Sequence, residues 1–61
     1  MGVGENIRSA RQRANLTQKQ LGALCGIAEP TIRRYELNKL NPKFDTIAKI
    51  ASALGVSAAK L

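Results

Sequence analysis

The pattern of apolar and polar residues is most regular on either side of a glycine near the middle of the chain. Over residues 18–25, Leu21, Leu24 and Cys25 fall at positions i, i+3 and i+4, the spacing of one face of a helix. Gly26 follows directly, where a helix commonly ends in the left-handed conformation that a residue without Cβ adopts at little cost. The pattern predicts a short helix that ends at Gly26.

The segment after this glycine repeats the spacing over about residues 29–37, where Ile32, Tyr35 and Glu36 share one face. Two helices this short cannot bury their faces alone, so the chain on either side is expected to cover them. A helix, a tight turn and a second helix in this order form a helix-turn-helix pattern, which we place at about residues 17–37.

Helical spacing continues on the N-terminal side. Residues 1–4 are predicted to be a loose start, because Gly2 and Gly4 disfavour helix. A helix is then expected over about residues 5–14, with the apolar positions Ile7, Ala10 and Ala14 on one face.

On the C-terminal side, a further helix has a broad apolar face made of Phe44, Ile47, Ile50, Ala51 and Leu54. Gly55 ends this helix, Val56 is expected to fill the core, and Ser57 is expected to cap one last turn that ends at Leu61. The predicted fold is all-α: a single compact domain of four to five helices over residues 1–61, with the fifth helix cut short.

Residues with known capping preferences mark the ends of these helices. Thr17 and Gln20 have the spacing of a capping box at the start of the second helix. Asn38 is suited to a left-handed residue after the third helix, and Pro42 ends any continuation of it.

Two charged residues lie on faces that are otherwise apolar. Arg11 is one turn after Ile7 on the first helix, and Glu36 is on the inner face of the third. An arginine at such a position either extends its head group to solvent or meets a buried acid. We expect an ion pair between Arg11 and Glu36 that locks the first helix to the third.

The charge balance points to an acidic partner. The chain of 61 residues has ten lysines and arginines against four acids, a net charge of +6, which favours nucleic acid. One tyrosine and one phenylalanine offer few platforms on which single-stranded bases could stack, so duplex DNA is the better match.

The same composition argues against other classes of function. The chain has no histidine, one thiol, and four carboxylates that form no plausible acid–base pair, namely Glu5, Glu29, Glu36 and Asp45. It has no metal-ligand cluster and no glycine-rich phosphate loop, so we expect no enzyme activity, cofactor, metal or small-molecule ligand. No apolar run could span a bilayer and no signal peptide is present, so a cytoplasmic location is expected. The single Cys25 is expected to be a reduced core residue rather than a redox switch.

The stretch from Gln18 to Glu36 resembles the DNA-binding domain of the phage repressor and Cro family, the lambda-repressor-like transcriptional regulators. The residues that carry the resemblance are Gln18, Leu21, Gly26, Ile27, Ile32, Tyr35 and Glu36, and the similarity extends from Ile7 to Ser57. It implies a lambda-repressor-like fold and sequence-specific binding of double-stranded DNA in transcription regulation, most simply repression. The family also has an arginine–glutamate pair like Arg11 and Glu36.

Two positions depart from the family pattern. Gly22 replaces the usual alanine, at a cost of roughly 1 kcal/mol in helix propensity. Ala28 occupies the N-cap of the third helix, where serine or threonine would supply a capping hydrogen bond.

The outward face of the third helix carries the candidate base contacts, which are Glu29, Pro30, Arg33 and Arg34. Arg34 can present its planar fork to guanine or pair with a phosphate. Glu29 can accept a hydrogen bond from cytosine N4 or simply favour the positive helix N-terminus. Pro30 suits the methyl group of thymine, and Arg33 suits base or phosphate equally.

Candidate phosphate contacts flank this face: Thr17, Gln18, Thr31, Lys39, Asn41 and Lys43. The resemblance assigns a phosphate to Gln18, the first residue of the second helix, assisted by the helix N-terminus. It also implies a homodimer on a near-palindromic operator, for which residues beyond Leu61 could be needed. Two alternatives remain open, the antitoxin of a toxin–antitoxin pair and a protein-interaction module with the same fold.

Overall fold

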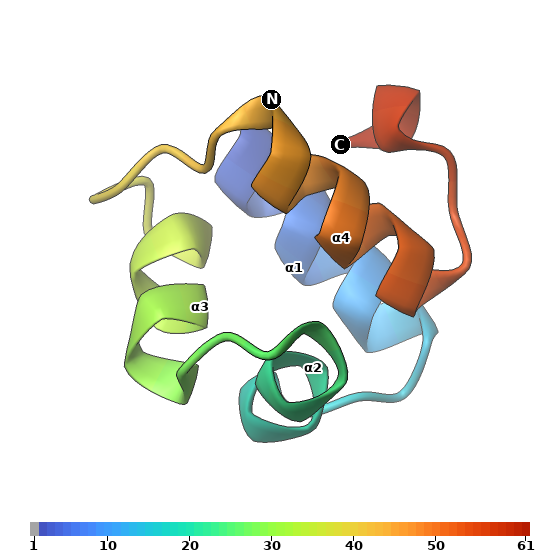
Figure 1. The fold of residues 1–61 in the computed structure, drawn as a ribbon, viewed down its shortest axis with the longest axis horizontal. Coiled ribbons are helices and arrows are strands. Elements are labelled where there is room, and N and C mark those ends of the chain that lie inside the picture. Colours follow the sequence, from blue (N-terminus) through green and yellow to red (C-terminus); the bar gives the residue numbers. More distant parts are fainter. Residues whose placement is uncertain (1) are drawn as a thin grey trace.

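A computed structural model of the chain describes residues 2–61 and shows four α-helices followed by one short 3-10 turn. The helices are α1 (Val3–Arg13), α2 (Gln18–Cys25), α3 (Glu29–Glu36) and α4 (Phe44–Leu54), and the turn is η1 (Ala58–Lys60). Figure 1 shows α4 lying in front of α1, with α3 and α2 packed along two sides of this pair. Within the described part of the chain the longest helices have 11 residues, and none is long and apolar enough to cross a membrane.

The core lies where the four helices meet. Ile7, Leu21, Ile32 and Ile50, one from each helix, are completely buried, and Ala10, Tyr35 and Leu54 extend the cluster. Helix α3 packs against both α1 and α2, and α4 packs against α1, α2 and η1. The predicted all-α fold with a helix-turn-helix is confirmed, and Val56 packs against the core as expected.

The start of α1 differs from the prediction. Residues 1–4 were expected to be loose, yet the helix begins at Val3, and Met1 lies outside the described residues. Gly4 is buried where α1 meets the end of α3, and a Cβ there would lie 2.4 Å from the carbonyl oxygen of Tyr35. Gly4 therefore weakens the helix locally but lets the backbone of α1 approach the end of α3 more closely than a larger residue would allow.

Asn38 strengthens this junction between α1 and α3. It has the predicted left-handed conformation, with φ of 59°. Its Oδ1 accepts a hydrogen bond from Gly4 N at 3.2 Å, and its Nδ2 donates to Glu5 Oε1 at 2.9 Å. The hydrogen bond from Asn38 also lowers the pKa of the Glu5 carboxyl. The sequence predicted the conformation of Asn38 but not these contacts.

Three residues expected on buried faces are exposed, namely Ala14, Leu24 and Phe44. Ala14 is the C-cap of α1. Phe44 is 78% exposed because it begins α4, and helical side chains lean toward the N-terminus and so past the packed part of the helix. The buried face of α2 centres on Leu21 and Gly22, from which Leu24 is rotated by roughly 110°.

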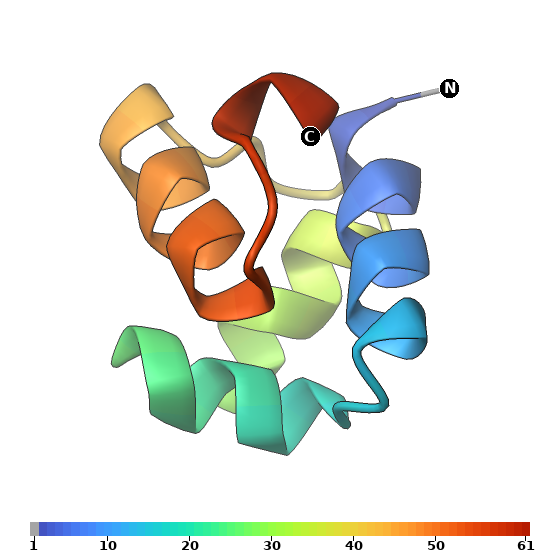
Figure 2. The ribbon, with the colours of Figure 1, turned by 90° about the vertical axis from the view of Figure 1, so that its right-hand side faces the viewer.

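Gly22 and the C-terminal segment complete the framework. A Cβ on Gly22 would lie 2.4 Å from the carbonyl oxygen of Ile27, so this glycine lets the turn fold back on α2 and is more than a loss of helix propensity. Ser57 Oγ accepts a hydrogen bond from Ala59 N at 3.2 Å. The 3-10 turn η1 lies beside the start of α1 (Figure 2), and the Leu61 carbonyl accepts a hydrogen bond from Asn6 Nδ2 at 3.2 Å. This last contact ties the end of the chain to α1.

Candidate nucleic-acid interface

The turn between α2 and α3 fixes the direction of the candidate recognition helix. Thr17 and Gln20 form the predicted capping box, with Gln20 N donating to Thr17 Oγ1 at 3.0 Å and Thr17 N donating to Gln20 Oε1 at 2.8 Å. Gly26 ends α2 in the left-handed conformation, with φ of 71°. Ala28 gives α3 no side-chain cap, and Pro30 lies in the first turn, where its missing N–H is not needed.

Arg11 and Glu36 form an ion pair at the far end of the helix-turn-helix from this turn, where the start of α2 meets the end of α3. Arg11 Nε lies 2.6 Å from Glu36 Oε2 and its second terminal nitrogen lies 3.0 Å from Oε1, while the side chains are only 12% and 3% exposed. The other terminal nitrogen of Arg11 donates to the Leu16 carbonyl at 2.8 Å. This contact with Glu36 raises the pKa of Arg11. The pair therefore joins α1, the loop before α2, and α3.

Gln18 also reaches this ion pair. Its Nε2 donates to Glu36 Oε1 at 3.1 Å, so the side chain assigned to phosphate contact is partly directed into the protein. Gln18 is the first residue of α2, and the backbone N–H groups of that first turn have no partner within the helix. The sequence did not predict that Gln18 braces Glu36, because that contact depends on the angle between α2 and α3.

The outward face of α3 exposes Pro30, Arg33 and Arg34, with Glu29 partly exposed and Thr31 half-buried. Arg33 and Glu29 form an ion pair one helical turn apart, with 3.8 Å between a terminal nitrogen of Arg33 and Glu29 Oε2. Two residues assigned separately to base contacts thus lie together at the N-terminal end of α3, which is the lower end of that helix in Figure 1.

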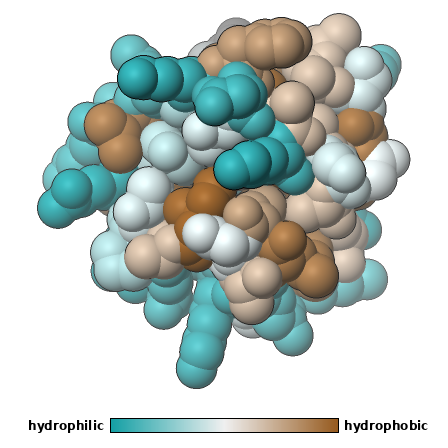
Figure 3. Space-filling view, in the orientation of Figure 1, coloured by the Kyte–Doolittle hydropathy of each residue, from teal (hydrophilic) through white to brown (hydrophobic). Residues whose placement is uncertain are grey.

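The loop from α3 to α4 exposes Lys39, Asn41 and Lys43, the remaining candidate phosphate contacts. Lys43 is the N-cap of α4, where its ammonium group, which has no acceptor, cannot cap the helix, and it has no ion-pair partner within the described residues. Hydrophilic side chains predominate along the left edge of the molecule in Figure 3, where this loop lies, although a small apolar patch interrupts them, and a larger apolar patch lies nearer the middle. The loop thus adds basic groups beside α3.

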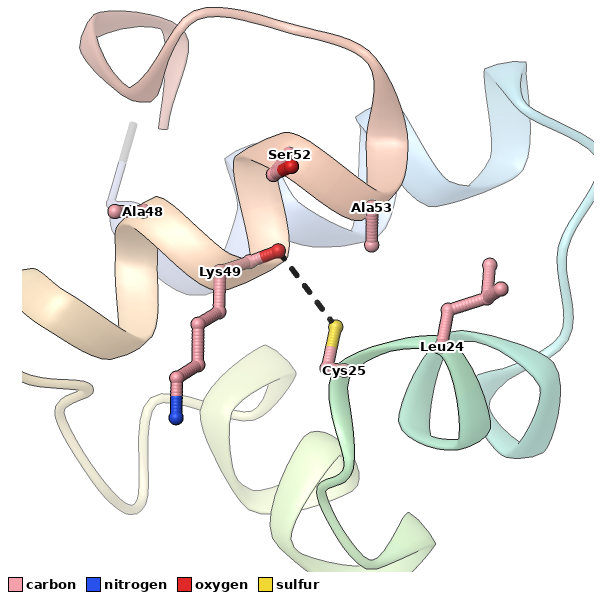
Figure 4. A pocket seen from close by; sticks show the side chains of 6 residues that line it. All are labelled: Leu24, Cys25, Ala48, Lys49, Ser52 and Ala53. Carbon is pink, nitrogen blue, oxygen red and sulfur yellow. Dashed lines mark hydrogen bonds between the residues drawn. The ribbon is translucent and has the colours of Figure 1, made fainter.

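A shallow groove between α2 and α4 contains none of the candidate DNA contacts. It has a volume of about 430 Å³ and is lined by Leu24, Cys25, Ala48, Lys49, Ser52 and Ala53 (Figure 4). Cys25 is half-buried rather than fully in the core, and its Sγ donates to the Lys49 carbonyl at 4.0 Å. Burial raises the pKa of the Cys25 thiol, and the charge of Lys49 lowers it less.

Comparisons with known proteins agree with this architecture. The family model for helix-turn-helix domains, HTH_3, matches residues 7–61. An uncharacterised HTH-type transcriptional regulator of Haemophilus influenzae is 38% identical over 47 residues, which cover 77% of this chain and 48% of that protein. The immunity repressor of Bacillus phage phi105 is 32% identical over 56 residues, covering 92% of this chain and 39% of the repressor.

Among solved structures, the P22 c2 repressor in complex with a synthetic operator matches with a TM-score of 0.88 and 26% sequence identity. The match covers 95% of this chain and 88% of that chain. The chain spans less than half the length of the two curated relatives described above. The family match covers the helix-turn-helix, the whole of α4 and α1 from Ile7 onward, and the chain belongs to the helix-turn-helix family HTH_3.

Proposed function

We propose that this domain binds double-stranded DNA sequence-specifically and regulates transcription, most simply as a repressor. The observation that carries the proposal is the exposed, arginine-bearing face of α3 on a framework that matches an operator-bound repressor. A protein-interaction module without DNA contacts would not need Arg33 and Arg34 on this face. Regulators of transcription among the relatives support the same function.

In this arrangement α3 enters the major groove with its N-terminal end toward the bases. The proposed base-reading face is formed by Glu29, Pro30, Arg33 and Arg34, because they lie on the outward face near that end. The arginines suit the O6 and N7 acceptors of guanine, and Pro30 suits the methyl group of thymine.

Phosphates on either side are proposed to bind two groups of residues. Thr17 and Gln18 lie at the start of α2, where the capping box leaves the backbone N–H groups of Gln18 and Lys19 free, and Thr31 in the first turn of α3 is the third member of this group. Lys39, Asn41 and Lys43 offer exposed donors on the loop after α3. These contacts position the domain but carry little sequence information.

One such domain covers only a short half-site, so we propose that two copies bind a near-palindromic operator. Half-sites read in this way lie about one helical turn, or ~34 Å, apart. Selection of bound duplexes from a random pool tests the proposal. Enrichment of a repeated half-site supports both DNA binding and pairing, and enrichment of a single half-site argues against pairing.

Salt dependence gives an independent measurement on the selected site. Neutralising phosphates releases counterions, so the log–log slope of affinity against salt is expected to be about −0.9 for each phosphate contact. With roughly four to six contacts per domain, the slope is steep. No enriched sequence, together with a slope near zero, would remove DNA from the partners of this domain.

A further inference from the structure

The exposed ion pair between Glu29 and Arg33 is the feature of α3 that base contacts alone do not explain. Residues 2–61 contain two ion pairs, and the other one, Arg11 with Glu36, is buried at the opposite end of α3. The side chains of Glu29 and Arg33 are 42% and 56% exposed. An ion pair this exposed adds little to the stability of the fold. The more important effect of the Glu29–Arg33 pair is therefore the direction that it gives to the arginine side chain.

The geometry places the head group of Arg33 near the tip of the recognition helix. Long side chains on a helix lean toward its N-terminus, and Glu29 is one turn before Arg33 in that direction. A terminal nitrogen of Arg33 lies 3.8 Å from the Glu29 carboxylate. The head group of Arg33 is therefore directed along the helix toward its N-terminus and does not project outward from the middle of α3. The tip is the part that meets base edges when such a helix enters the major groove.

Arg33 retains free donors in this position. A guanidinium has five N–H donors in a rigid fork, and the contact with Glu29 uses one of its terminal nitrogens. The remaining donors can meet the O6 and N7 acceptors of guanine. Arg34, the next residue, has no carboxylate partner within the described residues, so its head group is free to take either a base or a phosphate.

We propose that Glu29 is a positioning residue for Arg33: it directs the guanidinium of Arg33 toward a guanine edge rather than itself contacting cytosine. This inference rests on the proposed DNA binding. It assigns Arg33 to a base, whereas the sequence alone favoured base and phosphate equally. The carboxylate has a second effect at the same place. Its negative charge repels phosphates within about 10 Å at 0.1 M salt, which disfavours DNA held by backbone contacts alone.

Positioning and direct contact predict different changes in base preference. If Glu29 acts through Arg33, Glu29→Gln relaxes preference at the same base pair as Arg33→Ala, and the two effects are not additive. If Glu29 contacts cytosine itself, its substitution relaxes a different base pair and adds to the loss from Arg33→Ala. If Glu29 only repels phosphate, Glu29→Gln tightens binding to every sequence equally.

The experiment titrates the parent domain, Glu29→Gln, Arg33→Ala and the double variant against the selected site and all of its single-base variants. Glu5→Gln is the matched control, because it removes the same charge from α1 and keeps an oxygen that can accept from Asn38. Circular dichroism melts of all variants check folding, which exposed substitutions are expected to preserve.

Arg33→Ala is expected to lose about 5- to 150-fold discrimination at one base pair, the range for a bidentate contact. Glu29→Gln is expected to lose a smaller part of it at the same base pair and to bind random duplex more tightly, while Glu5→Gln leaves the base preference unchanged. Relaxation at another base pair, additivity in the double variant, or a uniform change would each overturn the inference. Failure of the parent domain to select any site would instead overturn the proposed function.

Discussion

The two arginine–glutamate pairs at opposite ends of α3 have similar chemistry but different surroundings. Arg11 and Glu36 lie beneath the helix-turn-helix, with four hydrogen bonds in the cluster that also includes Gln18 and the Leu16 carbonyl. Glu29 and Arg33 lie in solvent at the other end, with one contact of 3.8 Å. Burial thus makes the first pair part of the architecture, and exposure leaves the second able to direct a side chain toward DNA.

The buried pair is expected to give the largest effect. Arg11→Met or Glu36→Gln alone should destabilise the fold by about 3–5 kcal/mol. The first variant leaves the buried Glu36 carboxylate without its partner, and the second leaves the Arg11 guanidinium without its partner. In so small a domain this loss could unfold the protein at room temperature. Urea unfolding followed by circular dichroism measures it, with Arg8→Met on the exposed side of α1 as the control.

A double variant sharpens the same point. Replacing both members by apolar residues, as in Arg11→Met with Glu36→Leu, removes the buried charges together and should recover much of the loss. Unfolding midpoints of both single variants equal to the parent would mean that the pair does not lock α1 to α3. The comparison between the two ends of α3 would then fail.

Arg34 tests the exposed end through binding. Arg34→Ala is expected to cost about 1–3 kcal/mol on the selected site and to relax preference at one base pair per half-site. Lys49→Ala, on the exposed side of α4, is the control and should change little. Equal weakening on every single-base variant would make Arg34 a phosphate contact, and no weakening would mean that α3 docks by another face.

Lys43 offers a smaller and sequence-independent effect. As an exposed residue of the loop before α4, it is proposed to contact a phosphate rather than a base. Lys43→Ala should weaken all duplexes similarly and make the log–log salt slope shallower by about one unit. A change in base preference, or an unchanged slope, would contradict this assignment.

The periodicity of the sequence predicted the parts of the fold that depend on local spacing. One face of each helix could be assigned, so Ile7, Ile32 and Ile50 were placed in the core, and the unusual positions of Arg11 and Glu36 suggested their pairing. The capping box at Thr17 and the left-handed Gly26 were likewise visible, because caps depend on neighbours in the chain.

What the sequence could not give depends on how helices cross and where they end. The contact of Gln18 with Glu36 requires the angle between α2 and α3, and the burial of Gly4 requires the approach of α1 to the end of α3. Spacing alone put Leu24 and Phe44 on apolar faces, although Leu24 is turned away from the buried face of α2 and Phe44 lies beyond the packed part of α4. At the candidate site it predicted Glu29 and Arg33 individually but not that they contact each other.

The smallest expected effect is that of the exposed pair on stability. Glu29→Gln should destabilise the fold by less than about 1 kcal/mol, since an exposed pair at i and i+4 contributes only about 0.3–0.5 kcal/mol and a carboxylate at a helix N-terminus adds a similar amount. Arg33→Ala removes the pair but keeps the carboxylate, so comparing the two variants by urea unfolding separates these contributions. A loss near that of Glu36→Gln would show that the exposed pair is also architectural, and the contrast between the two ends of α3 would no longer hold. Because the Glu29–Arg33 pair is exposed, we expect these variants to lose little stability and to change the base preference of the domain.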